Sequence, residues 1–122
     1  MANLDQIANF IADNFNSLET TVLYDSSTKQ TSGTISIPTI ADYNALVVYT
    51  KTNTEYFSDI IFLGSNLGVG QNITYAKTVS TYTSWIIMTP VQTGLYVSAQ
   101  ATNPNWILGV IKIVGIKFAG KH

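Results

Sequence analysis

A two-residue period that begins after Thr20 constrains this chain more than any other feature of its sequence. Threonine, valine, isoleucine and tyrosine are enriched from there on, and glycine, asparagine, serine and proline interrupt the pattern at short intervals. Such a pattern is typical of short antiparallel strands joined by turns. It predicts an all-β domain over residues 21–122, an antiparallel, jelly-roll-like β-sandwich of seven or eight strands. The predicted strands are 21–24, 33–37, 45–51, 56–63, 72–79, 83–88, 94–99 and 106–116.

The turns between these strands are predicted from residues that favour turns. Pro38 and Pro90 are expected just after strands, and Pro104 is expected within a turn, where a missing N–H does not interrupt a ladder of hydrogen bonds. The predicted turns are 25–32, 53–54, 64–70, 89–93 and 102–105.

The first 20 residues follow a helical period instead, and they predict one N-terminal α-helix. Read as heptads, the helix has leucine and isoleucine at its core positions, together with one asparagine that would set the register. Isoleucine at both kinds of core position favours three or more helices, so we expect residues 1–20 to be an oligomerisation helix that forms a homotrimer. Because two heptads are too few for an independently stable coiled coil, the alternative is a single amphipathic helix lying on its own domain. The core positions are Leu4, Ile7, Ile11, Asn14 and Leu18.

The last predicted strand is apolar on both faces. An outer strand of a monomer has one wet face, so the pattern predicts a strand covered by the opposite sheet on one side and by a neighbouring subunit on the other. A central strand lying under loops would carry the same pattern. The residues on the first face are Leu108, Val110, Val114 and Ile116, and those on the second are Ile107, Ile111 and Ile113.

Charge and cysteine content narrow the classes of function. Six lysines, no arginine and seven acids leave a net charge of -1, whereas nucleic-acid binding needs clustered cations, so nucleic acid is not an expected partner. Because the chain has no cysteine, it has neither disulfides nor a thiolate metal site. Asp5 and Asp13 interrupt the N-terminal apolar residues and the first lysine is Lys29, so we expect neither a signal peptide nor insertion into a membrane.

Few residues are available for catalysis, and we expect a protein that is not an enzyme and binds no metal or cofactor. The one histidine, His122, is the last residue, which argues against a Ser-His-Asp arrangement and a histidine metal cluster. Glu55 and Asp59 would share a strand face if strand geometry held between them, and they could then form the carboxylate pair of a glycan hydrolase. The more ordinary explanation is that these charges protect an edge strand from aggregation.

The loop near residue 105 and several aromatic residues indicate a saccharide site. Sugar sites combine an aromatic ring, which stacks on the apolar face of a pyranose, with amides and hydroxyls that bind its hydroxyl groups. The alternative is that these rings fill the core and make cross-strand pairs. The expected ligand-binding residues are Asn103, Asn105, Trp106, Trp85, Tyr82 and Tyr96, with Tyr75 as a further candidate.

Three stretches carry a family resemblance: Leu23-Tyr24 leading to residues 33–37, then residues 42–49, and finally residues 110–117. Together with the short N-terminal helix and the Thr/Ser/Asn-rich β domain, they make the whole chain resemble small tail-tip, baseplate or receptor-binding proteins of tailed bacteriophages. The resemblance implies a homotrimeric virion protein, assembled in the host cytoplasm, that binds saccharide or another envelope component of the bacterial surface. The alternative is a purely structural tail, baseplate or neck component that contacts other virion proteins.

Overall fold

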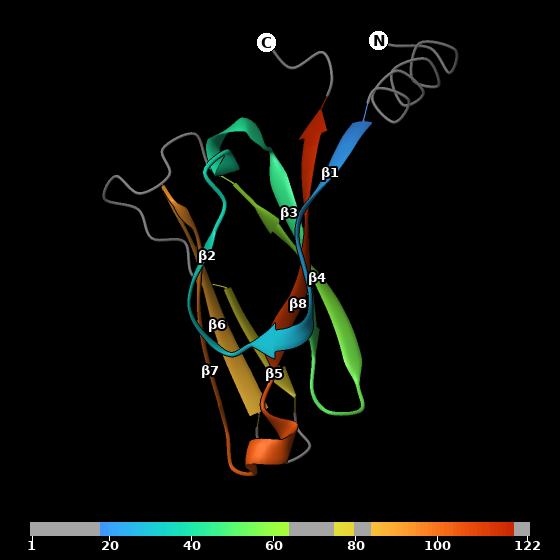
Figure 1. Ribbon diagram of the computed structural model, residues 1–122, viewed down its shortest axis with the longest axis vertical. Coiled ribbons are helices and arrows are strands. Elements are labelled where there is room, and N and C mark those ends of the chain that lie inside the picture. The colour runs from blue at the N-terminus through green and yellow to red at the C-terminus, as the bar shows by residue number, and fades with distance from the viewer. Residues whose placement is uncertain (1–17, 64–74, 80–83, 119–122) are drawn as a thin grey trace, which may run out of the picture.

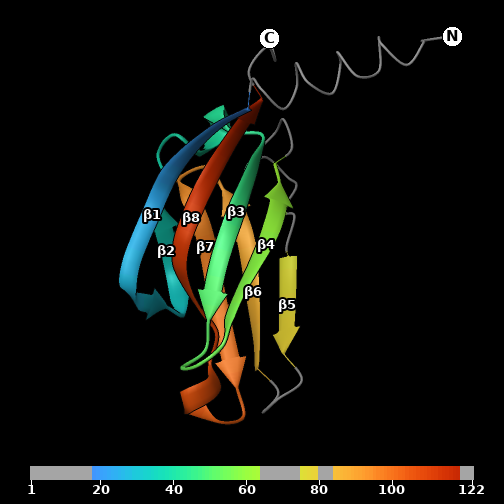
Figure 2. The ribbon, with the colours of Figure 1, turned by 90° about the vertical axis from the view of Figure 1, so that its right-hand side faces the viewer.

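The computed structural model describes residues 18–63, 75–79 and 84–118, and in this part of the chain the fold is all-β. Two four-stranded antiparallel sheets lie face to face (Figure 1). Sheet A has the strand order β1-β8-β3-β4, seen from left to right in Figure 2, and sheet B, behind it, has the order β2-β7-β6-β5. The predicted all-β fold with two antiparallel sheets is therefore confirmed. The strands are β1 (Leu18–Gln30), β2 (Ser32–Ser36), β3 (Ala45–Lys51), β4 (Tyr56–Phe62), β5 (Tyr75–Val79), β6 (Ser84–Val91), β7 (Gly94–Ala101) and β8 (Gly109–Phe118).

The core between the two sheets is almost entirely aliphatic. Strand β3 illustrates how the two-residue period builds it, because Leu46 and Val48 are fully buried while Tyr49 points to the other side of the sheet. Full burial of one such aliphatic side chain contributes about 1.5–3 kcal/mol. The buried cluster consists of Ile35, Ile37, Ile40, Leu46, Val48, Ile61, Ile86, Met88, Leu95, Val97, Leu108, Val110 and Ile113.

Strand β1 begins earlier than predicted. Its first residue is Leu18 instead of Thr21, so the predicted helix over residues 1–20 is wrong for its last three residues. The rest of that helix lies outside the described residues. The physical reason is pairing with β8: residues 18–20 align with residues 116–118, and the neighbouring strand supplies partners for their backbone groups.

The predicted turn at 25–32 is also wrong, because β1 continues to Gln30. Between Asp25 and Gln30, β1 advances by five residues while β8 advances by two, so the extra residues form a bulge within the paired strands. Polar residues that favour turns also favour bulges, and the sequence pattern does not distinguish the two.

Lys29 connects this bulge by hydrogen bonds to the end of the sandwich. Its Nζ donates hydrogen bonds to the carbonyl oxygen of Ile107 at 2.7 Å and to Oδ1 of Asn53 at 3.2 Å. Its aliphatic chain packs on Gly109, where an added Cβ would lie 2.6 Å from the Lys29 Cβ. Desolvation, with a second contribution from the charge of Lys51, lowers the pKa of Lys29 below its ordinary 10.5.

Strands β6 and β7 form a hairpin whose turn is shorter than the predicted turn at 89–93. The turn consists of residues 92–93, and Pro90 lies within β6 instead of after a strand. In the described residues β5 pairs with β6 only as far as Met88, so the missing N–H of Pro90 interrupts no pairing on that side.

The predicted strand at 106–116 is shifted toward the C-terminus. Strand β8 begins at Gly109, and Pro104–Trp106 form a short 3-10 helix, η3, at the end of the sandwich. Asn103 explains this local structure: its Oδ1 accepts a hydrogen bond from the backbone N–H of Asn105 at 3.0 Å, as an N-cap does, and proline follows at the first helical position.

Strand β8 lies at the centre of sheet A, between β1 and β3. Its Val110 and Ile113 are fully buried against sheet B, whereas Val114 and Ile116 point to the outer side of sheet A. No other strand or helix of the described residues covers that outer side (Figure 2). The predicted faces are therefore wrong in this strand: Val110, predicted to share a face with Val114, lies on the inner side with Ile113, because a register shift between Tyr49 and Thr50 changes the alternation. Cover of the outer side by a neighbouring subunit stays a prediction.

Candidate functional site

The outer side of sheet A is a continuous apolar surface, which we call the apolar face. The antiparallel register sets its residues directly opposite one another, in two adjacent rows that cross all four strands. Tyr49, Tyr56 and Phe118 extend the rows along the strands. The first row is Val22, Val114, Val47 and Ile60, and the second is Thr20, Ile116, Ala45 and Phe62. In the second row Thr20 is polar, and Ala45 is covered by its neighbours and is only 1% exposed.

Several side chains of the apolar face are unusually exposed for apolar residues. The exposed fraction is 61% for Phe62, 55% for Val22, 53% for Ile60 and 40% for Phe118. Single exposed apolar residues are common on soluble proteins, whereas contiguous rows mark surfaces that contact another molecule. The apolar face is therefore the strongest candidate for an interaction surface in the described residues.

Two lysines lie beside tyrosines at one end of the apolar face. Lys51 Nζ is 5.3 Å from the centroid of the Tyr56 ring, and Lys112 Nζ is 5.9 Å from that of Tyr49. Both distances are within the range of a cation–π interaction. The aliphatic part of each lysine can cover apolar surface while its charge stays in water, so this end forms a polar rim.

Sequence reasoning identified only part of this surface, namely the last strand. Strands β3 and β4 are also apolar on both sides: Ile61 faces the core, while its neighbours Ile60 and Phe62 face outward. The available signal was a run of consecutive apolar residues in place of strict alternation, at 45–48 and 60–63.

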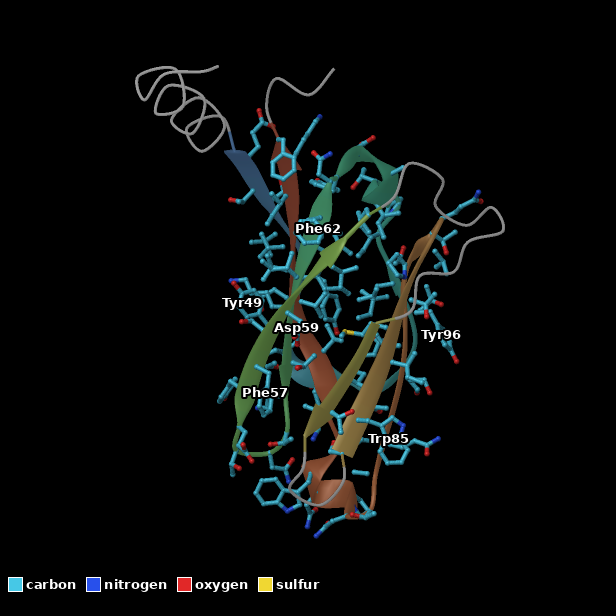
Figure 3. All side chains as sticks on the ribbon, turned by 180° about the vertical axis from the view of Figure 1, so that it is seen from behind. Tyr49, Phe57, Asp59, Phe62, Trp85 and Tyr96 are labelled. Carbon is cyan, nitrogen blue, oxygen red and sulfur yellow. The ribbon has the colours of Figure 1, made fainter. Side chains whose placement is uncertain are left out.

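The outer side of sheet B has the opposite character, and we call it the hydroxyl face. Its most exposed aromatic residue is Tyr96 on β7, which is 44% exposed and lies between Thr34 on β2 and Thr89 on β6. Figure 3 shows Tyr49 and Tyr96 on opposite sides of the molecule, pointing away from each other. Further residues of the hydroxyl face include Ser32, Ser36, Thr78, Trp85, Ile87, Ser98 and Gln100.

The structure places two of the predicted ligand-binding aromatics, Trp85 and Tyr96, on this same face (Figure 3). Tyr96 aligns with Thr89, four residues along β6 from Trp85, which corresponds to about 13 Å along a strand. Trp85 aligns with Gln100 near the end of β7, where the chain leads into η3. Trp85 is therefore at the η3 end of the sheet, and Tyr96 lies toward the β6–β7 turn.

The predicted polar part of the saccharide site lies in η3. Asn105 is exposed and Trp106 is half-buried, while the Asn103 side-chain oxygen is engaged in its cap. The backbone N–H of Trp106 also donates to the Asn103 carbonyl oxygen at 2.9 Å, which tightens this turn. The remaining predicted ligand residue, Tyr82, lies outside the described residues.

Of the predicted oligomerisation positions, Leu18 lies in the described residues and is the first residue of β1. It aligns with Phe118, at the apolar end of sheet A. The other positions, Leu4, Ile7, Ile11 and Asn14, lie outside the described residues.

The carboxylates Glu55 and Asp59 do not share a continuous strand. Strand β4 begins at Tyr56, and Glu55 lies in the preceding turn, where its backbone N–H donates to Oγ1 of Thr52 at 3.1 Å. Asp59 aligns with the buried Val48, so its side chain is on the inner side of sheet A. The strand geometry on which the hydrolase alternative depended is therefore absent.

The described residues contain no group of three or more histidine, cysteine, aspartate or glutamate side chains that could hold a metal ion. No helix in them has the length and apolarity needed to span a membrane.

No protein-family model matches the sequence, and neither a curated protein nor a solved structure matches it.

Proposed function

We propose that this chain is an adhesion module of a phage-type virion, which forms a homotrimer and binds a saccharide or another component of the bacterial surface. The observation that carries the proposal is the hydroxyl face, where the exposed Tyr96 ring lies between Thr34 and Thr89, and Trp85 lies on the same sheet opposite the amide-bearing Gln100. Such rings stack on sugars, and such polar groups bind their hydroxyls without a large net charge. Three linked copies would add avidity to individually weak contacts.

The proposal includes a jelly-roll-like path of the chain and an oligomerisation helix before β1. The jelly-roll likeness is supported by nested pairing, since the first strand pairs with the last and the second with the seventh. The helix is supported by the apolar spacing of residues 4–15.

The test is binding of the labelled protein to a bacterial glycan array and to intact bacteria. Binding should change little with ionic strength, because the net charge is only -1. The Tyr96→Ala and Trp85→Ala variants should each bind about tenfold more weakly, which corresponds to the loss of one stacked ring. Thr54→Ala changes an exposed side chain in the turn between β3 and β4, on neither outer face, and should bind as the wild type does. If the wild type binds no glycan and no cell at any concentration, the adhesion function is rejected.

The apolar face favours a second function, that of a structural component contacting other virion proteins. This function requires the apolar face to remain accessible after the chain has assembled with itself, because a face buried between copies cannot contact another protein. Probing the accessibility of that face in the assembled protein therefore separates the two functions.

A further inference from the structure

We propose that the apolar face is the surface on which copies of this chain meet, so that each sheet A faces the three-fold axis and each sheet B faces outward. This inference rests on the homotrimer proposed above and adds which surface forms it. It also explains how one small domain serves two purposes. The apolar face would hold the copies together, while the hydroxyl face would remain free for a ligand.

The apolar face exposes enough apolar surface to form an interface. The described residues include seven exposed large hydrophobic side chains, and six of them lie on the outer side of sheet A. At about 200 Å² for each fully exposed side chain, these six together present roughly 600 Å² to solvent. A stable interface buries about 800 Å² per partner, and the half-buried side chains of the same two rows contribute to the remainder. The six residues are Val22, Tyr49, Tyr56, Ile60, Phe62 and Phe118.

The charged residues of the apolar face lie at its edge and not at its centre. The two rows contain no charged residue, and Lys51 and Lys112 lie together at one end of the face beside tyrosine rings. A second copy could therefore cover the rows without burying an unpaired charge, which would be costly. A neutral centre with a polar rim is the usual anatomy of a protein interface.

The N-terminal segment joins sheet A at the end of the apolar face. Residues 1–17 precede β1, and the chain enters sheet A at Leu18, aligned with Phe118 at the apolar end of the face. The heptad spacing of that segment predicts that it associates with its counterparts in other copies. Two heptads associate weakly alone, so an adjoining apolar face that meets its counterparts would supply the missing contact.

The association test compares two aspartate variants on edge strands. Ile60→Asp places a charge in the first row of the apolar face, and Thr78→Asp places the same charge at an exposed position of β5 in sheet B. Sedimentation of the wild type should give three times the monomer mass. Ile60→Asp should raise the concentration needed for half-association by about 30-fold or more, as expected for a residue in the centre of an interface. Thr78→Asp should change it by less than about twofold, and circular dichroism should show both variants folded.

A thiol-reactivity measurement provides a test that does not depend on weakening the assembly. Because the chain has no cysteine, Ile60→Cys and Thr78→Cys each introduce a single thiol. At concentrations that give the trimer mass, the Ile60→Cys thiol should react with a maleimide about tenfold more slowly than after dilution to monomer. The Thr78→Cys thiol should react at the same rate in the trimer and in the monomer.

The outcomes separate this inference from the proposed function. A trimer in which the Ile60→Cys thiol reacts at the monomer rate would overturn the inference, and the trimer and its structural role would stand. A stable monomer at micromolar concentration would reject the trimer itself. If the Ile60→Cys thiol were protected in that monomer, the apolar face would be covered by the chain's own N-terminal segment. The inference would then also be overturned.

Discussion

The two outer faces of this sandwich use the same strand geometry but have opposite surfaces. On sheet A, Val22, Ile60 and Phe62 are more than half exposed, whereas sheet B presents Thr34 and Ser36 at its outer edge strand. Exposed apolar surface costs about 25 cal/mol for each Å² left in water, so contiguous rows favour contact with another molecule. A two-layer sandwich can therefore present one sheet to water while the other carries apolar surface on both of its sides.

The largest expected effect separates the two sides of β4. Ile61→Ala should lower the free energy of unfolding by about 3 kcal/mol, because it leaves a cavity in the core. Ile60→Ala should lower it by less than about 1 kcal/mol in the monomer, where this side chain is half exposed. Urea denaturation below the concentration of self-association measures both values. Equal effects would show that the two sides of sheet A do not differ in burial.

A smaller effect is expected at the edge that carries the hydroxyl face. A Cβ at Gly94 would overlap the carbonyl oxygen of Ile35, so Gly94→Ala should destabilise the β2–β7 pairing by about 2 kcal/mol. Gly33 is the matched control, because its φ is also positive, at +91°, but an added Cβ would meet nothing closer than 3.7 Å. Gly33→Ala should cost about 1 kcal/mol. Thermal unfolding measures both losses of stability. A larger loss for Gly33→Ala than for Gly94→Ala would contradict close packing at Gly94.

A third prediction concerns the polar rim of the apolar face. Lys51→Met keeps most of the aliphatic chain and removes the cation beside Tyr56, so it should lower the free energy of unfolding by about 0.5 kcal/mol. Lys117→Met, at an exposed position near the other end of sheet A, is the control for loss of one charge. An equal loss of stability in the two variants in urea would argue against the ring contact.

The smallest effect is a pH dependence at the bulge of β1. The folded state lowers the pKa of Lys29, so it releases this proton at a lower pH than the unfolded state does. Between that lowered pKa and 10.5, the unfolded state binds more protons, and stability therefore rises with pH. The stability of the wild type should rise relative to that of Lys29→Met as the pH approaches 10.5. Chemical denaturation measures the free energy of unfolding of both proteins at each pH. If the two values changed with pH in parallel, the lowered pKa of Lys29 would be contradicted.

The parts of the fold that depend on local pattern were predictable. Strand β3 coincides with the predicted segment 45–51, and β7 begins at the predicted Gly94. In contrast, Pro90 and the bulge of β1 contain the same residue types that end strands. Pro90 stays within β6 because it pairs with Leu95 across the short β6–β7 turn, and the bulge stays within β1 because β1 pairs with the distant β8. Local propensity is weaker than these contacts between strands.

The candidate site was predictable to a smaller extent. Aromatic and amide residue types indicated Trp85 and Tyr96, but their common face depends on the pairing of β6 with β7. The apolar face was indicated only at the last strand. Its continuation over Val22 and Ile60 requires β1 and β4 to lie in the same sheet as β8, which no local pattern specifies.

In a strand without a bulge, the two-residue period is enough to show which side chains share a side. It places Ile60 and Phe62 together and Ile61 opposite them, whatever the sheet packs against. In β8 a register shift breaks the period, so Val110 and Val114 lie on opposite sides. Which side of the sheet became the core depended on how the two sheets pack in the folded chain. Hydrophobic attraction has no direction, so either side could have been buried. Sheet B lies against the side that carries Ile61 and Leu46, and the rows on the other side of sheet A were thereby left outside.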